Sequence, residues 1–308
     1  MLESKTPMLS VTEQLNRGYL VCPETHVPLV RLPGGGLQTQ DGLHRYEAVT
    51  GTPILLSDPV VAESYLARQS GAMLAEYSQI RTSRARQLYN HLLGAVGDMR
   101  SPGSEAAFQK IFDQRPPDAL YLSIGGGPVR VHPCLVNVNI GLFPNVDVVA
   151  DAYELPYADA CAEGVHCEAV LEHLEFPARA VEEMHRVLKP GGLAFFATPF
   201  LQSFHGYPDH YQNFTLTGHT RLFERAGFVV LSAGTCVGPT FALRDLAMNY
   251  ARQIIPGFAG KALSRILGLL LLPCLYIDRW ANARTGSSDL ASTTFALVQR
   301  SSPLPLER

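Results

Sequence analysis

The sequence predicts an α/β protein with a mostly parallel sheet covered by helices on both faces, a small β module before it and a helical insertion before the last strand. After Ala119, short apolar runs alternate with stretches of helical periodicity, and Gly or Pro-Gly stands at several junctions. Strands that alternate with helices favour a parallel sheet buried on both faces. At 308 residues, 46% hydrophobic and 17% charged, the chain can bury such a core.

Charge and cysteine usage narrow the function classes. A net charge of −3 gives no electrostatic reason to expect a nucleic-acid partner. The six cysteines have no repeated CxxC spacing, so no disulfide framework is expected. The N-terminus MLESKTPMLSVTEQ has no apolar signal region, and the most apolar run, Ile266–Ile277, is interrupted by Pro273 and too short to cross a bilayer. We therefore expect a cytoplasmic protein.

The first two segments differ in character. Within residues 1–58, short apolar runs over Tyr19–Leu56 are separated by Gly, Pro and Asp-Gly turns, which predicts a compact β module. The spacing of Cys22, His26 and His44 fits no standard zinc site, so we expect this module to be metal-free and predict no metal site in the chain. Residues 59–118 are expected to form a helical linker region, with two helices over Pro59–Val96.

Residues 119–308 carry the main sheet, with the insertion over 238–290. The predicted strands are Ala119–Ile124, Leu135–Ile140, Val146–Ala150, Gly164–Val170, Leu193–Thr198, Phe228–Ser232 and Thr293–Gln299. The helix Pro177–Leu188 ends at a Lys-Pro-Gly-Gly stop, and the helix Leu216–Ala226 ends at Gly227. The connections among the first three strands are too short for full crossover helices, so we expect a trimmed and more open sheet face.

Polar groups follow the ends of four neighbouring strands. Glycines 125–127 follow the first, Asn139 ends the second, Asp151 follows the third, and Glu168–His173 follows the fourth. Ligands of open α/β sheets bind beyond the carboxyl ends of the strands. Glycines permit close backbone approach, an amide suits ribose hydroxyls and a carboxylate suits the adenine amino group. The pattern therefore predicts a site for an adenosine-containing cofactor.

The order of three motifs resembles a known family. The motifs are GGG, then DAYELPYAD at Asp151–Asp159, then AVLEHLEFPARAVEEMHRVLKPGG at Ala169–Gly192. In this order they resemble class I S-adenosylmethionine-dependent methyltransferases of the type 11 group, over roughly Ala119–Ser232. The resemblance implies a Rossmann-like fold, S-adenosyl-L-methionine as cofactor and methyl transfer as activity. It implies cofactor contacts at Ser123, Gly125, Gly126, Gly127, Asn139, Asp151, Ala152, Glu168 and Ala169.

Several positions depart from the patterns of that family. Ser123 stands where an acid usually precedes the glycine loop, and Asn139 stands where an acid usually meets the ribose. Neutral hydrogen bonds contribute about 0.5–1.5 kcal/mol against about 1.5–3 for charged ones, so we expect a variant site with weaker cofactor binding. The segment from Cys22 resembles the small zinc-ribbon-like module found beside such enzymes, with Thr25 in place of the second cysteine.

Two other function classes stay open at this point. One is a non-catalytic relative that keeps the fold as a binding or scaffold protein, for which Ser123 and Asn139 are the motivation. The other is an oxidoreductase that binds a dinucleotide on the same fold, since fold does not fix function. The second lacks a GxGxxG motif followed by a full helix.

The segment Phe200–Thr215, FLQSFHGYPDHYQNFT, leaves the sheet on the cofactor side and is expected to hold the methyl acceptor. Methyl transfer is an in-line displacement, and a base is needed only if the acceptor must lose a proton. Because imidazole titrates near neutrality, His205 and His210 are the candidate general bases. The candidate substrate-binding residues are Tyr207, Tyr211 and His173. We expect the acceptor atom to be an oxygen or nitrogen of a small or amphiphilic metabolite.

The insertion from Gly238 to Leu290 is rich in leucine. A helical lid or a dimer surface is one interpretation. The other is a lipid-facing patch, in which residues 262–278 make peripheral membrane contact and bring an amphiphilic acceptor to the site. Basic residues are few for attraction to anionic lipid, and the sequence leaves the oligomeric state open.

Overall fold

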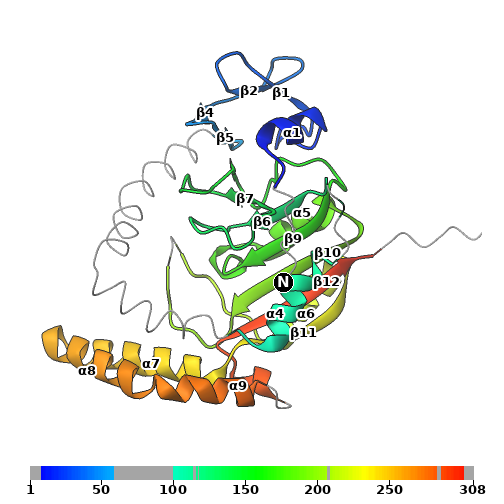
Figure 1. Ribbon diagram of the computed structural model, residues 1–308. Helices are drawn as coiled ribbons and strands as arrows, with labels where there is room; N and C mark the ends of the chain where they lie inside the picture. Colours follow the sequence, from blue (N-terminus) through cyan, green and yellow to red (C-terminus); the bar gives the residue numbers. More distant parts are fainter. Residues whose placement is uncertain are drawn as a thin grey trace, which may run out of the picture.

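The computed structural model describes residues 8–58, 100–113, 116, 118–206, 209–282 and 286–301 (Figure 1). The two helices predicted within Pro59–Val96 and the candidate residue Tyr207 lie outside the described residues.

A nine-stranded sheet forms the centre of the molecule, in the order β11-β12-β10-β9-β6-β7-β8-β5-β4. Its strands are β4 (Ala48–Val49), β5 (Thr52–Leu55), β6 (Tyr121–Ile124), β7 (Leu135–Asn139), β8 (Val148–Ala150), β9 (Ala162–Glu168), β10 (Leu188–Pro199), β11 (Phe228–Val237) and β12 (Thr293–Arg300). Every neighbouring pair from β10 to β5 is parallel, while β12 runs antiparallel between β10 and β11. The predicted mostly parallel sheet is confirmed.

Helices cover both faces of this sheet. Side chains alternate between the faces along a strand, so Phe195 and Phe196 of β10 point to opposite sides. Phe195 meets Phe108 of α4 (Pro102–Lys110), with ring centroids 5.7 Å apart. Phe196 stacks on Phe223 of α6 (Leu216–Arg225) at 4.2 Å. The helix α5 (Pro177–Val187) packs beside α6, with its buried residues in the same core as Phe223.

The connections β6–β7 and β7–β8 contain no helix, and all residues of both connections are described. A polar network holds them together instead. The Arg130 guanidinium forms two hydrogen bonds to the Asp147 carboxylate, at 2.8 and 2.9 Å. Asp147 also accepts the backbone N–H of Asn137, whose side-chain amide donates to the carbonyls of Gly127 and Asn145. The expectation of a trimmed sheet face is confirmed, and this network ties the glycine loop to the next connection.

The N-terminal segment contains α1 (Val11–Asn16) and an antiparallel sheet of β1 (Leu29–Arg31), β2 (Leu37–Thr39) and β3 (Arg45–Tyr46). Its apolar side chains enter the same core as Leu155 and Tyr157 of the main body. The last strand of this segment, β5, pairs with β8 and lengthens the main sheet. The division of the chain at residues 58 and 118 stays a prediction.

The insertion is helical, with α7 (Pro239–Ile254), α8 (Gly257–Leu270), η2 (Pro273–Ile277), α9 (Asp278–Ala281) and η3 (Ser287–Leu290). The helices α7 and α8 lie side by side and project from one end of the sheet (Figure 1). The buried carboxylate of Asp278 accepts the N–H groups of Thr240 and Phe241 and so caps α7. One segment of the described chain, Gly257–Ile277, is long and apolar enough to be a candidate membrane span, and 22% of its most apolar window is buried. This span is longer than the run Ile266–Ile277 on which the sequence expectation rested.

Candidate functional site

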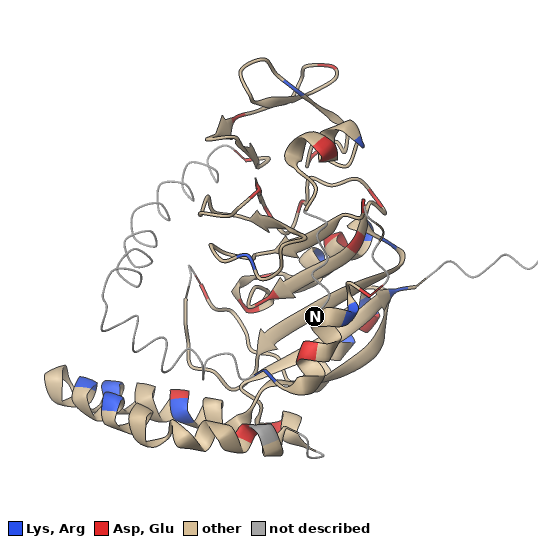
Figure 2. Cartoon of the chain, viewed as in Figure 1, with Lys and Arg blue, Asp and Glu red and all other residues tan. Residues whose placement is uncertain are grey.

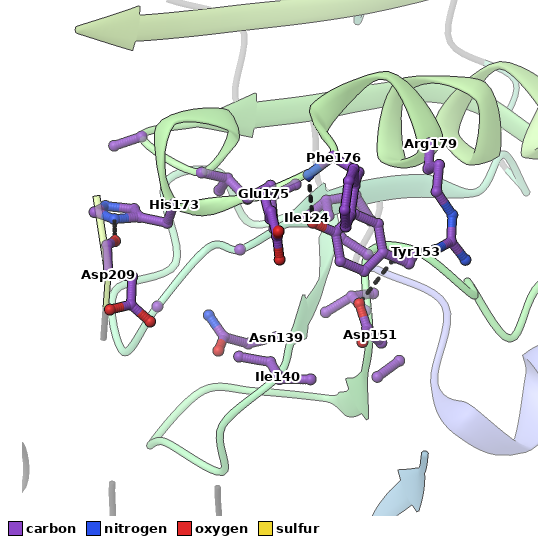
Figure 3. A pocket seen from close by; sticks show the side chains of 18 of the residues that line it. Ile124, Asn139, Ile140, Asp151, Tyr153, His173, Glu175, Phe176, Arg179 and Asp209 are labelled. Carbon is purple, nitrogen blue, oxygen red and sulfur yellow. Dashed lines mark hydrogen bonds between the residues drawn. The ribbon is translucent and has the colours of Figure 1, made fainter. Parts of the chain in front are cut away.

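A cavity of about 450 Å³ opens beyond the carboxyl ends of β6, β7, β8 and β9 (Figure 3). This volume lies within the roughly 300–1,000 Å³ typical of sites for small ligands. Of the predicted cofactor contacts, those that line the cavity are Gly125, Gly127, Asn139, Asp151, Ala152 and Ala169. The strand ends thus come together as the topology of a parallel sheet requires.

The glycine loop forms one wall of the cavity. Gly125 and Gly127 have φ of +74° and +61°, a region that side chains other than glycine rarely adopt. A Cβ atom at Gly125 would lie 2.2 Å from a methyl group of Val170, so only glycine fits there. A Cβ at Gly126 would lie 2.3 Å from Asn137 Oδ1, which means that Gly126 packs behind the wall instead of lining the cavity.

Asn139 and Asp151 present polar groups from neighbouring strands (Figure 3). The Asn139 Oδ1 atom accepts the backbone N–H of Gly141 at 2.9 Å, so the remaining hydrogen-bonding group of this side chain is its NH₂. Asp151 Oδ1 accepts the N–H of Tyr153 at 2.9 Å, and burial raises the pKa of this carboxyl above its ordinary value. The Arg179 guanidinium lies 5.2 Å from the Tyr153 ring centroid and closes this end of the cavity.

Ser123 and Glu168, two further predicted cofactor contacts, lie behind the cavity in a buried polar chain. Ser123 Oγ is 3.2 Å from His166 Nδ1, and His166 Nε2 is 3.3 Å from Glu168 Oε2. The Arg100 guanidinium donates to the same Glu168 oxygen at 2.5 Å. Although burial opposes it, the contacts with His166 and Arg100 hold the pKa of Glu168 below its ordinary value. Arg100 and His166 are not among the predicted site residues. The placement of His166 and Glu168 two positions apart, on one face of a strand, was the available signal.

Of the histidines and tyrosines predicted to bind the acceptor or act as bases, His173 and Tyr211 line the cavity, whereas His205 and His210 do not. The rings of these two histidines lie 5.3 and 5.8 Å from that of His173, measured between centroids. His210 Nδ1 accepts the backbone N–H of His205 at 3.2 Å, so its Nε2 carries the proton and donates to Asn213 Oδ1 at 2.7 Å. Both nitrogens of His210 are therefore engaged in holding the loop.

Glu172, which the sequence analysis passed over, lies beneath these histidines. Its side chain is 0% exposed, and its two carboxylate oxygens have no hydrogen-bond partner among the described residues. The Glu172 Oε1 atom lies 3.7 Å from His173 Nε2 and 3.8 Å from His205 Nε2. The nearby carboxylate raises the pKa of His205 above its ordinary value.

Comparison with known proteins shows which proteins the strands around this cavity resemble in sequence. Residues 135–196 match the family model described as "Methyltransferase domain". A probable S-adenosylmethionine-dependent methyltransferase of Mycobacterium tuberculosis is 36% identical over 121 residues, which cover 37% of this chain and 43% of the relative. An uncharacterized 37.1 kDa protein from a transposon of Streptomyces fradiae is 29% identical over 178 residues, or 52% of this chain and 50% of that one. The chain thus spans half or less of the length of these curated relatives.

Among solved structures, phosphoethanolamine N-methyltransferase 2 of Haemonchus contortus in complex with S-adenosyl-L-methionine aligns at 15% identity with a TM-score of 0.41, covering 69% of this chain and 56% of that one. The family match includes β7, β8 and β9, of which β7 ends in Asn139, β9 ends in Glu168 and β8 directly precedes Asp151. Over residues 135–196 the chain is therefore similar to a methyltransferase domain, and curated relatives that it matches in part are named as probable S-adenosylmethionine-dependent methyltransferases.

Proposed function

We propose that this protein transfers the methyl group of S-adenosyl-L-methionine to an oxygen or nitrogen of a small or amphiphilic metabolite in the cytoplasm. The cavity at the carboxyl edge of the sheet is the observation that carries the proposal. Its wall suits the cofactor because the glycine loop lines it without side chains at Gly125 and Gly127, which permits close approach, and the Asn139 amide faces the cavity. The Asp151 carboxylate directly follows the next strand, β8, where the resemblance assigns the contact to adenine.

The residues of this chain act by binding and alignment. When bound, the cofactor supplies an electrophilic methyl group on a positively charged sulfur. The acceptor lone pair forms the new bond to the methyl carbon, and the electron pair of the broken carbon–sulfur bond stays on sulfur, giving a neutral thioether. An acceptor hydroxyl or ammonium group must also release a proton. We assign His173 and Tyr211 to the acceptor because both line the cavity, and His210 to positioning because its two nitrogens hold the loop.

Calorimetric titration of S-adenosylmethionine tests this function first. We expect micromolar binding to the full chain and its loss in Asp151→Ala. The matched control is Asp159→Ala, which removes the other carboxylate that ends the same motif but is 72% exposed and paired with Arg186. Absence of binding at millimolar cofactor, with the protein folded, would overturn the proposal and favour a scaffold protein that keeps only the fold.

Basic residues are few within 262–278, but those of α7 add to them, so we also propose that the α7–α8 hairpin docks on an anionic lipid surface, from which an amphiphilic acceptor reaches the cavity. Large apolar side chains on the hairpin are exposed, Phe258 at 81% and Tyr250 at 68%. Several Lys and Arg residues lie along the same two helices (Figure 2). Those that line a second cavity between the two helices are Arg244, Arg252, Lys261 and Arg265, and none of them forms an ion pair with a described residue. Cations next to an apolar face are complementary to anionic lipid.

Co-sedimentation with lipid vesicles tests the docking surface. The protein should pellet with vesicles that contain phosphatidylserine, less at high salt, and little with pure phosphatidylcholine. Lys261→Glu should reduce the pelleted fraction, whereas Lys110→Glu, the same exchange on the exposed end of α4, should not. Equal binding of both variants, or no binding to either vesicle, would contradict a lipid surface.

A further inference from the structure

The buried carboxylate of Glu172 accepts no hydrogen bond from a described residue, and the imidazoles of His173 and His205 lie beside it. An ionised carboxylate that is shielded from water and accepts no hydrogen bond lowers the stability of the folded protein by roughly several kcal/mol unless a cation lies beside it. Glu172 is fully buried and both of its oxygens lack a hydrogen bond. At 3.7 and 3.8 Å, the His173 and His205 nitrogens are too far away to donate one. A cation held between Glu172 and these two imidazoles would therefore satisfy the carboxylate.

The two neighbouring histidines direct lone pairs toward the same carboxylate. His173 Nδ1 lies 2.6 Å from the carbonyl oxygen of Asp209, and His205 Nδ1 lies 2.9 Å from that of Ser203. Because a carbonyl only accepts, each Nδ1 carries a proton, and in the neutral ring each Nε2 then has a free lone pair. Both Nε2 atoms face Glu172 Oε1. An Nδ1–H donated to a backbone carbonyl is the support that orients metal-ligating histidines.

We propose that Glu172, His173 and His205 bind a divalent first-row transition metal ion. The three donor atoms lie within 4.8 Å of one another, and this is the one such group of histidine, cysteine and acidic side chains found in the described chain. An ion with bonds of roughly 2.0–2.2 Å to nitrogen and oxygen joins donors that are up to about 4.2 Å apart. The two measured separations from Glu172 Oε1 fall below this limit. Imidazole ligands favour zinc, iron or nickel over magnesium or calcium.

Neighbouring groups fix the frame of this site. The backbone N–H of Tyr211 donates to the Glu172 carbonyl at 2.8 Å. This bond connects the loop after β10 to the turn η1 (Leu171–His173), which carries two of the three proposed ligands. His210 holds the backbone N–H of His205, as described above. With three protein ligands, a bound ion keeps at least one coordination position free for water or substrate, as in catalytic zinc sites.

This inference deepens the proposed function and rests on it for the role of the ion. Because His173 lines the cofactor cavity, an open coordination position on that side is available to a hydroxyl oxygen of the acceptor. A bound cation lowers the pKa of such a hydroxyl, so its proton passes to solvent. The oxygen lone pair then forms the bond to the methyl carbon, and the carbon–sulfur electron pair stays on sulfur. The acceptor class is therefore a metabolite with a hydroxyl group.

Metal titration of the chelator-stripped full chain tests the site without relying on activity. Zn²⁺ should bind at one equivalent by calorimetry, and Co²⁺ should give ligand-field absorption bands. Glu172→Gln and His205→Asn should each weaken Zn²⁺ binding by at least the roughly 10–100-fold that loss of a supporting group costs. His44→Asn is the matched control, a histidine near Glu24 and far from the group, and should bind like the parent. No uptake by the parent, or equal uptake by Glu172→Gln, would overturn the proposal.

Thermal unfolding separates a metal ligand from a residue that only supports the fold. Metal-free Glu172→Gln should melt no lower than the metal-free parent, because an isosteric amide removes an uncompensated charge. Added Zn²⁺ should raise the melting temperature of the parent but not of the variant. A lower melting temperature for the metal-free variant would contradict the inference. Titration of S-adenosylmethionine into metal-free protein tests the proposed function separately, so failure of one proposal is not mistaken for failure of the other.

Discussion

Asn139→Asp should tighten the binding of S-adenosylmethionine. In the structure one side of the Asn139 amide is committed, since its Oδ1 accepts the N–H of Gly141 at 2.9 Å. A carboxylate at this position keeps that bond with one oxygen and turns the other toward the cavity in place of the NH₂ group. The new oxygen accepts from ribose hydroxyls as a charged group.

The magnitude follows from exchanging a neutral for a charged hydrogen bond. Neutral bonds contribute about 0.5–1.5 kcal/mol and charged bonds about 1.5–3, so the gain is on the order of 1 kcal/mol. That is about a fivefold lower dissociation constant. Asn16→Asp, the same change at the exposed end of α1, is the matched control and should leave the affinity unchanged.

Calorimetry with two ligands distinguishes a local contact from a general charge effect. S-adenosylhomocysteine has the same ribose but lacks the sulfonium charge. A hydrogen bond to the ribose should tighten both ligands by a similar factor, whereas long-range attraction should tighten S-adenosylmethionine alone. Unchanged or weaker binding of both ligands to Asn139→Asp would refute the assignment of Asn139 to the ribose.

Three further changes test the site and its frame. Gly125→Ala should weaken cofactor binding at least tenfold by calorimetry, because a positive φ costs about 1–2 kcal/mol and the new Cβ displaces Val170. Burial lowers the pKa of His219 to about 3. As the pH falls below about 6.5, the unfolded chain takes up a proton at this histidine before the folded chain does, so the free energy of unfolding decreases. Urea unfolding should show that this free energy falls by about 2 kcal/mol between pH 7 and pH 5 in the parent but not in His219→Gln. Arg130→Ala should lower the free energy of unfolding by about 2–4 kcal/mol, because Asp147 then keeps a largely buried charge without its partner, and an unchanged urea midpoint would contradict this.

The strand ends could be predicted because a short-range pattern determines them. Apolar runs mark the strands, and in a parallel sheet the residues after each run meet at one edge, which brings Gly125, Asn139 and Asp151 together. The sequence resemblance added the class of cofactor. The strand boundaries differ from the predicted ones by a few residues, as expected where the ends of elements have weak signals.

The residues that sequence reasoning misplaced or missed are those whose partners lie far away in the chain. Glu168 is the last residue of β9, but its side chain pairs with Arg100, 68 positions earlier, and does not line the cavity. Glu172 looked like an ordinary residue of a turn. Its burial depends on the loop with His205, which only the tertiary fold brings over it. No local pattern reports such a contact.

The absence of a crossover helix after the glycine loop bears on which cofactor fits. A helix that starts at such a loop directs N–H groups and a positive dipole at a phosphate, which is how dinucleotide sites bind their pyrophosphate. Residues 125–134, all described, contain no helix, and the Asn137 side chain holds the loop in its place. S-adenosylmethionine has no phosphate, and its one anionic group is the carboxylate of its methionine part, so it depends less on a helix N-terminus at this loop than a dinucleotide does. A dinucleotide would lose its main anion-binding group, and this difference argues against the oxidoreductase alternative on physical grounds.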